Sequence, residues 1–338
     1  MYILNEIPVK TTNNFNINNI KVDLDIPTNL DNNKFITKNV DDISVTYSKI
    51  TNFKTNIGLD LESALNIDIN IEKSVLEPIE FTYIFDDDNL ADNININCSK
   101  GVSANLIFKY ASNTNNKNFH HLKQVINLDN NSNVTISVIN LLNKNSVSLI
   151  ASESNLSDYA VLNQYLFDIG GNIKIDNYES KAAKYAESYL KNIYLGNSND
   201  IIDMNYHYLN IGNNSITNIE SQGVLNDKAS KNFRGTIDFI SGCSKSIGKE
   251  NENCVLLSDS CKSRSVPLLL CGEEDVEGAH SVSSGKIDSD KLFYITSRGI
   301  SEEDAKKMII MSNFNKIIDE INNENISQEI LSILDKSI

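Results

Sequence analysis

The sequence of 338 residues lacks Trp, has only 4 Pro, and contains no apolar run long enough to cross a membrane as a helix. Basic side chains are scarce as well: 30 Lys and Arg stand against 45 Asp and Glu, which gives a formal net charge of −15. This balance argues against a protein that follows the phosphate backbone of a nucleic acid. The first residues carry neither the basic nor the apolar region of a signal peptide, so we expect no membrane partner and a cytoplasmic protein.

Motifs for nucleotide and hydrolytic chemistry are also missing. Gly248-Lys249 and Gly285-Lys286 lack the remainder of a Walker A motif, and no Gly-x-Ser-x-Gly sequence occurs, so we expect no ATP hydrolysis by this chain alone. We interpret Gly170-Gly171 as a turn rather than a phosphate cradle, and Asp86-Asp87-Asp88 as a solvated loop rather than a cation site. The 5 Cys are an odd number in a long chain, which favours reduced thiols over a disulfide framework.

What the sequence has in excess is Asn, with 51 residues. Asn disfavours helix interiors and favours tight turns. From about residue 42 to 270 apolar and polar residues alternate in short runs, as in 94–98, 133–139 and 172–176. Each run is closed by Asn, Ser, Gly or Asp, which is typical of strands joined by turns.

About 200 residues of short strands without clear helices fit a sandwich, a barrel or a β-solenoid. Segment 178–190 fits either a helix or a pair of strands, and segment 15–26 either an extended arm or a short helix. No strict repeat period is present, but stacked turns can carry ladders of Asn side chains, which favours the solenoid.

The pattern changes near residue 272. Asp288 is placed to cap a helix that ends near Ser297, and Ser301 is placed to cap a second one. A last helix is expected to begin near Ser327. Residues 271–338 hold 14 acidic and 7 basic side chains, a net −7 of the total −15. One face of the second helix is apolar and consists of Ala305, Ile309, Phe314, Ile317, Ile318 and Ile321.

His280 stands out among the 4 His because it lies at the junction of the two regions, shortly after Cys254, Cys261 and Cys271. Thiolate and imidazole ligands suit iron–sulfur or zinc chemistry. No Cys-x-x-Cys spacing is present, which argues against a closed zinc site. His280 is therefore the candidate metal ligand, and a packed junction residue is the alternative.

Segment 285–305, which contains Lys-Ile-Asp, Leu-Phe-Tyr and Ser-Arg-Gly-Ile, closely resembles the SufB/SufD family of iron–sulfur cluster assembly scaffolds. Two further segments, 223–237 and 256–268, carry shorter matches, so that the resemblance covers roughly residues 160–320. It implies a mainly β fold: a right-handed β-helix (solenoid) core with a C-terminal α-helical region. The division we expect is an N-terminal arm over 1–41, the core over 42–271 and a helical ATPase-docking region over 272–338.

The resemblance also implies a function. The chain would be a non-catalytic scaffold subunit of the Suf complex that pairs with a SufB/SufD-type subunit, as a heterodimer or homodimer, and recruits a SufC-type ABC ATPase. An iron–sulfur cluster would be held transiently, with the dimer interface as its expected place. The partner-binding residues implied by the matching C-terminal region are Leu292, Phe293, Tyr294, Arg298, Ile309 and Phe314.

The sequence departs from the family pattern at the cluster-linked positions. Glu252 stands where SufB-like members have Cys, and Cys254 follows two places later. Ser281 and Gly278 replace a SufB-type Glu and a SufD-type Cys, so that only His280 is retained. His280, Cys254 and Glu252 are therefore the candidate cluster-binding residues, and the losses favour a SufD-like subunit or a divergent scaffold. The alternative from another class is a carbohydrate-binding or polysaccharide-cleaving β-solenoid.

Overall fold

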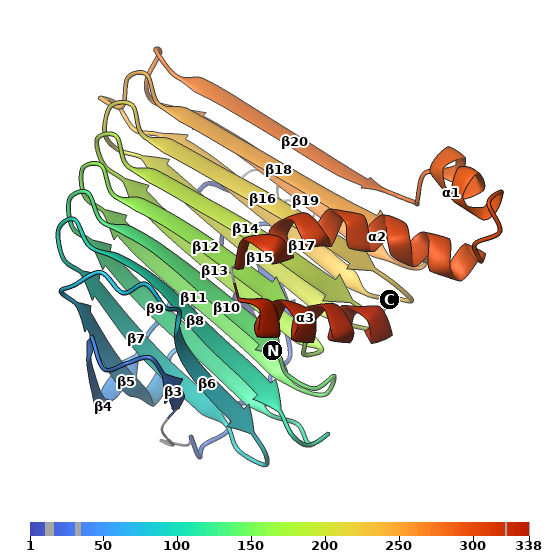
Figure 1. The fold of residues 1–338 in the computed structure, drawn as a ribbon, viewed down its shortest axis with the longest axis horizontal. Coiled ribbons are helices and arrows are strands. Elements are labelled where there is room, and N and C mark those ends of the chain that lie inside the picture. The colour runs from blue at the N-terminus through green and yellow to red at the C-terminus, as the bar shows by residue number, and fades with distance from the viewer. Residues whose placement is uncertain (11–16, 31–34, 322, 338) are drawn as a thin grey trace.

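The computed structural model describes residues 1–10, 17–30, 35–321 and 323–337. It is mainly β, with 53% strand against 13% helix, and forms a β-solenoid of about 8 turns with a C-terminal helical region. From β5 on, successive strands alternate between two nine-stranded sheets that face each other (Figure 1). The fold class expected from the sequence is confirmed.

One sheet, the helix-side sheet, carries the C-terminal helices on its outer surface. In spatial order it contains β20 (Glu277–Gly285), β18 (Ile247–Leu256), β16 (Ile216–Leu225), β14 (Glu187–Gly196), β12 (Val161–Asp168), β10 (Asn133–Leu141), β8 (Ser103–Ser112), β6 (Ile79–Phe85) and β3 (Ile36–Lys38).

The other sheet, the arm-side sheet, is covered by the N-terminal arm. It contains β19 (Lys262–Cys271), β17 (Ser230–Phe239), β15 (Ile201–Asn210), β13 (Ile173–Ala182), β11 (Val147–Leu156), β9 (Phe119–Leu128), β7 (Leu90–Cys98), β5 (Leu61–Ile71) and β4 (Ser44–Phe53). Neighbouring strands are parallel in both sheets, except for the antiparallel pairs β3–β6 and β4–β5 at the N-terminal end.

The corners between strands show why the chain forms a solenoid. One corner repeats a residue with positive φ in successive turns, and in each case its N–H donates to a carbonyl of the next turn: Asn131 to Asp158, Tyr159 to Lys184, Tyr185 to Asn213, and Asn214 to Ser244. Asn tolerates this left-handed conformation better than most residues do. Segment 178–190 is a pair of strands because Tyr185 turns the chain at this corner between β13 and β14.

Asn also forms the ladder that we expected. The side-chain amides of Asn97, Asn127 and Asn155 each donate to the amide oxygen of the Asn one turn earlier, at 3.0–3.1 Å, and the ladder ends at Asn70. Because the strands pair without any shift in register, identical side chains stack at the spacing of the sheet.

The outer surface of the helix-side sheet is apolar where α2 (Glu302–Ile318) and α3 (Glu324–Ser337) cover it. A 3-10 turn, Asp319–Ile321, links the two helices. Ala305, Phe314 and Ile317 are buried as expected, but Ile310 is buried in place of Ile309, which is only half-buried. A shorter helix, α1 (Ser289–Thr296), begins at the expected cap Asp288.

The N-terminal arm is extended where it is described. β1 (Tyr2–Leu4) and β2 (Ile20–Val22) form a two-stranded antiparallel sheet whose apolar side chains pack on the arm-side sheet. The Asn5 amide anchors the arm by donating to the Asp203 carboxylate at 2.8 Å. The first two residues of segment 15–26 lie outside the described residues. In the described ranges no helix is both long and apolar enough to cross a membrane.

The sheets continue beyond residue 271, where we expected the helical region to begin. β20 pairs in parallel with β18 from Glu277 to Gly285, so the first helix follows one strand later than the change in composition suggested. The composition changes earlier because β19 and β20 are the last strands of their sheets and are much less buried than those before them.

Candidate functional site: the open end of the solenoid and the first helix

The C-terminal end of the solenoid is open. β19 and β20 are the edge strands of the two sheets, and no further turn covers them in the described part of the chain (Figure 1). Every residue of β20 is exposed except Val282, which is half-buried, although β20 has the length of the buried strands next to it. An edge strand presents unpaired backbone N–H and C=O groups, so this end is competent to pair with another chain.

His280 lies on the face of β20 that points into the solenoid. The register shows this, because His280 is opposite Glu250 on β18, and Glu250 is opposite the buried Ile219 on β16. The imidazole is exposed only because the end is open. His280 is therefore a junction residue, as expected, but not a packed one.

Cys254 and Glu252 lie on the inward face of β18, but neither of them is opposite His280 on β20. Cys254 is opposite Ser284, four residues along β20 from His280, or roughly 13 Å. The structure therefore does not bring these three residues together into one ligand set. Across the described ranges no group of three His, Cys, Asp or Glu side chains is arranged to hold a metal ion.

Glu252 is fully buried and fully hydrogen-bonded. One carboxylate oxygen accepts hydrogen bonds from Lys231 Nζ and Tyr194 OH, both at 2.6 Å. The other accepts one from Ser265 Oγ at 3.1 Å. Lys231 is buried too, and its ammonium also donates to Ser265 Oγ at 2.9 Å. A buried charge pair with its hydrogen bonds satisfied is a rigid element, and losing one partner would leave the other charge uncompensated.

The Cys254 thiol lies next to this ion pair and is buried. Burial raises its pKa, while the Lys231 ammonium and the Tyr194 hydroxyl act in the opposite direction. Tyr194 reaches both Glu252 and Cys254 because Gly223 stands between them: a Cβ at Gly223 would lie 1.9 Å from the Tyr194 ring. The family-type Gly-Val-Leu motif at 223–225 therefore makes room for a buried phenol.

Glu250 is a residue that the sequence reasoning missed. It is 2% exposed, and neither carboxylate oxygen has a hydrogen-bond partner in the described structure. Burial, and secondarily the nearby Glu252 charge, raises its pKa from 4.5 to about 8. Gly235 on the opposite sheet makes the space, because a Cβ there would lie 2.3 Å from the carboxylate. The alternation Glu250-x-Glu252-x-Cys254 was a visible signal, but only the fold shows that this face points inward.

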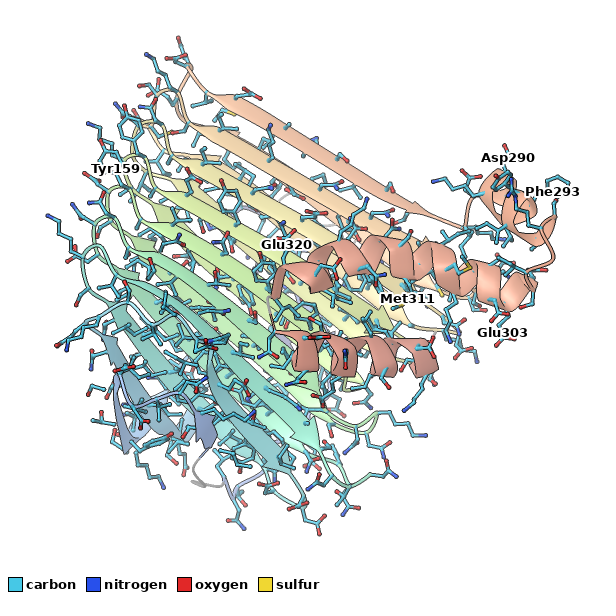
Figure 2. The ribbon with its side chains drawn as sticks, in the orientation of Figure 1. Tyr159, Asp290, Phe293, Glu303, Met311 and Glu320 are labelled. Carbon is cyan, nitrogen blue, oxygen red and sulfur yellow. The ribbon has the colours of Figure 1, made fainter. Side chains whose placement is uncertain are left out.

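The first C-terminal helix is the second unusual surface. None of the residues in α1 is buried; Phe293 is 75% and Tyr294 60% exposed. Figure 2 shows Phe293 and Asp290 on α1, away from the two sheets. Arg298 donates to Tyr294 OH at 2.6 Å and lies 4.7 Å from the ring centroid. A cation held against one exposed aromatic ring, with a second exposed aromatic side chain next to it in sequence, is a composition typical of interface anchors.

The other proposed partner-binding residues lie deeper. Leu292 and Ile309 are half-buried. Phe314 is 1% exposed and packs against the outer surface of the helix-side sheet, so it holds α2 in place and offers no surface to a partner. The family-like segment thus divides into an exposed part on α1 and a structural part on α2.

The two loops singled out in the sequence lie between strands, Gly170-Gly171 between β12 and β13 and Asp86–Asp88 between β6 and β7. The N–H groups of Gly170 and Gly171 donate to the carbonyls of Asn140 and Leu142, which makes the pair a turn. In the Asp86–Asp88 loop, the Asp88 carboxylate accepts hydrogen bonds from Tyr83 OH and from the backbone N–H of Asp86.

The family described as SUF system FeS cluster assembly, SufBD core domain, matches residues 83–313. The chain belongs to this SufBD family. The match covers most of the solenoid and all of α1, so it extends well before residue 160, where the recognisable motifs began.

Curated SufBD relatives are similar over shorter stretches. The iron–sulfur cluster assembly protein SufD of Bacillus subtilis is 26% identical over 148 residues, which is 44% of this chain and 34% of the relative. SufD of Escherichia coli is 28% identical over 109 residues, 32% of this chain and 26% of the relative. A SufBD family protein of Pyrococcus horikoshii is 33% identical over 90 residues, 27% of this chain and 20% of the relative. The chain therefore aligns with about a third or less of the length of these relatives.

Proposed function

We propose that this SufBD-family chain is a non-catalytic scaffold subunit in iron–sulfur cluster assembly. The observation that carries the proposal is the match of residues 83–313 to the SufBD core domain. Relatives named as SufD and as SufBD family proteins support it. The cluster is the cargo of such a scaffold, which is compatible with the finding that no three His, Cys, Asp or Glu side chains in the described ranges are arranged to hold a metal ion.

The scaffold would pair with a SufB/SufD-type subunit through its open end. β19 and β20 offer two edges side by side, and addition of strands from a second solenoid would satisfy their backbone groups and bury the inward face of β20. In that assembly His280 would contact the cluster at the interface, together with ligands of the partner. Cys254 and Glu252 lie one strand further inside, and their thiol and carboxylate would become accessible only if the last turn opened.

The pairing surface is testable with two variants on one strand. Val282→Asp introduces a charge on the inward face of β20, whereas Ser281→Asp introduces the same charge on the outward face. We expect Val282→Asp to weaken pairing with a SufB- or SufD-type chain by about tenfold or more, because the charge is desolvated there. Equal effects of the two variants in a pull-down titration would argue against this interface.

The helical region would recruit a SufC-type ABC ATPase through α1. Its exposed aromatic residues at 293 and 294 would provide the apolar centre of the contact, and the net −7 of residues 271–338 would suit a basic groove. The ATPase would supply the nucleotide chemistry for which this chain carries no Walker A motif.

Phe293→Ala combined with Tyr294→Ala tests the docking. The matched control is Tyr159→Ala with Tyr185→Ala, which removes two exposed aromatic side chains at the far corner of the solenoid. We expect the first pair of changes to abolish co-purification of the ATPase and the second to leave it intact. Retention of the ATPase by the α1 variant would contradict the docking proposal.

The cluster contact has its own test. After anaerobic reconstitution of the complex, His280→Ala is expected to lower iron and sulfide occupancy while leaving subunit pairing unchanged. Unchanged occupancy would exclude His280 as a ligand, without bearing on the two interfaces.

A further inference from the structure

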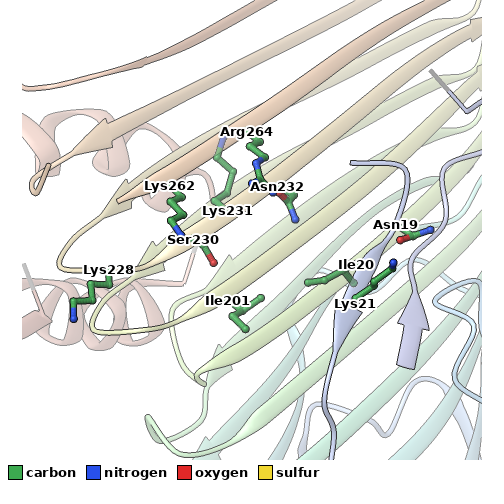
Figure 3. Close-up of a pocket in the computed structure, with 10 residues that line it drawn as sticks. All are labelled: Asn19, Ile20, Lys21, Ile201, Lys228, Ser230, Lys231, Asn232, Lys262 and Arg264. Atoms are coloured by element: carbon green, nitrogen blue, oxygen red, sulfur yellow. The ribbon is translucent and has the colours of Figure 1, made fainter. Parts of the chain in front are cut away.

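A pocket of about 400 Å³ lies between the N-terminal arm and the last strands of the arm-side sheet (Figure 3). Its lining comes from four places: β2 of the arm and the residue before it, the start of β15, the turn before β17 with the start of that strand, and the edge strand β19. The pocket is on the outside of the solenoid, and of the inward-facing residues discussed above only Lys231 is among its described lining residues. Its volume is within the range of small-molecule sites.

The pocket is strongly basic. Lys21, Lys228, Lys262 and Arg264 line it, and no Asp or Glu is among its described lining residues. In Figure 3, Lys228, Lys262 and Arg264 lie along the end of the arm-side sheet, and Lys21 lies on β2. This is an unusual concentration for a chain with 30 basic residues, 45 acidic residues and only three Arg.

Within the described ranges none of these four cations forms an ion pair, whereas other Lys side chains pair with exposed carboxylates, as Lys54 does with Asp60 and Lys286 with Asp259. Lys231 also lines the pocket, but its ammonium is buried and paired with Glu252. Four unpaired like charges around one cavity repel each other, and an anion in the cavity removes that repulsion.

Apart from these cations and Lys231, the pocket is lined by the polar Asn19, Ser230 and Asn232 and by the apolar Ile20 and Ile201. Asn232 donates to the buried Asp203 carboxylate at 3.0 Å, and Arg234 pairs with the same carboxylate from below. The Asp203 charge is therefore compensated inside the protein. The free positive charge of the four lining cations remains available to a ligand.

We infer that this pocket binds a small anion with at least two phosphate groups. Two features favour phosphate over carboxylate. The cationic donors come from three separate elements, which suits the tetrahedral arrangement of phosphate oxygens, and four positive charges match the charge of a diphosphate. The lack of carboxylates favours a ligand with no cationic part. This inference does not depend on the role in cluster assembly.

The test is isothermal titration calorimetry of the full-length chain with inorganic pyrophosphate, orthophosphate or citrate at constant ionic strength. Pyrophosphate is expected to bind with a Kd below about 1 mM and at least about fivefold more tightly than orthophosphate, because two phosphate groups engage. Citrate, a carboxylate anion of similar charge, is expected to bind more weakly than pyrophosphate. Citrate binding as tight as that of pyrophosphate would overturn the assignment to phosphate.

A charge-matched pair of variants separates a site from general attraction. Lys262→Gln with Arg264→Gln removes two pocket cations, and Lys100→Gln with Lys316→Gln removes two exposed, unpaired cations elsewhere. The pocket variant is expected to weaken pyrophosphate binding by about tenfold or more, and the control by less than about twofold. Equal losses, or no binding by the unaltered chain, would overturn the inference. Circular dichroism shows whether the variants keep their strands.

Discussion

Glu250 makes the stability of this protein depend on pH in a defined direction. Its carboxyl is buried with no hydrogen-bond partner among the described residues, and its pKa is raised from 4.5 to about 8, so the folded chain holds the proton more tightly than the unfolded chain does. The stabilisation due to this proton is complete below pH 4.5 and is lost as the pH rises through about 8. The change Glu250→Gln removes the titration and keeps the size of the side chain.

The magnitude follows from the two pKa values. Each pKa unit of difference between the folded and unfolded states corresponds to about 1.4 kcal/mol of unfolding free energy, so the full effect is about 5 kcal/mol. This is an upper value, because water entering the open end of the solenoid would reduce it. Between pH 5 and pH 8 the free energy of unfolding of Glu250→Gln should rise relative to the unaltered chain by up to about 3.5 kcal/mol.

The assay is urea unfolding of both chains, followed by circular dichroism, at several pH values between 5 and 8. The constant cost of a buried Gln amide cancels, because only the change with pH is compared. Glu62→Gln removes a carboxylate from an exposed position on β5 and controls for the loss of one negative charge. A difference between Glu250→Gln and the unaltered chain that stays constant across this range would refute the buried, protonated carboxyl.

Three further predictions concern stability and use the same urea assay. Arg234→Met leaves the buried Asp203 without its charge partner and should lower the free energy of unfolding by about 3–5 kcal/mol; a loss below 1 kcal/mol would contradict the pairing. Phe314→Ala should cost about 3–5 kcal/mol, because it leaves a cavity under α2, whereas Phe293→Ala on the exposed α1 should cost less than about 0.5 kcal/mol; similar values would contradict their opposite burial. His121 is buried, which lowers its pKa from 6.5 to about 3, so the unfolded chain binds protons first and stability should fall as the pH drops from 6.5 towards 3; His121→Gln should lack this part of the decline.

The sequence determined the fold class because its information is local. Alternating runs of about five to seven residues, closed by turn-forming side chains, specify strands and corners without reference to the rest of the chain. Caps such as Asp288 and Ser301 act within one helical turn, and both lie where we expected them. The family resemblance in segment 285–305 was equally local, because it depends on consecutive residues.

The segments that the sequence left open were decided by long-range pairing. Segment 178–190 has helix-forming Ala, Glu and Lys, yet it forms two strands because β13 and β14 each pair with two neighbours already in the sheets. Ile310 is buried instead of Ile309 because of the way α2 is rotated about its axis on the sheet. The helical periodicity of the sequence does not specify this rotation. In both cases contacts made elsewhere in the chain outweigh local preference.

The candidate site shows the same division. The sequence by itself singled out His280, Glu252 and Cys254 and the residues of α1. Only the tertiary structure showed that His280 is separated from Cys254 along the strands, and that Glu250 is buried without a partner. The same holds for Lys21, which joins three cations more than 200 residues away in one pocket. A residue type and its neighbours fix what a side chain can do chemically, but burial, charge pairing and proximity depend on which turns stack together, and that is a property of the whole solenoid.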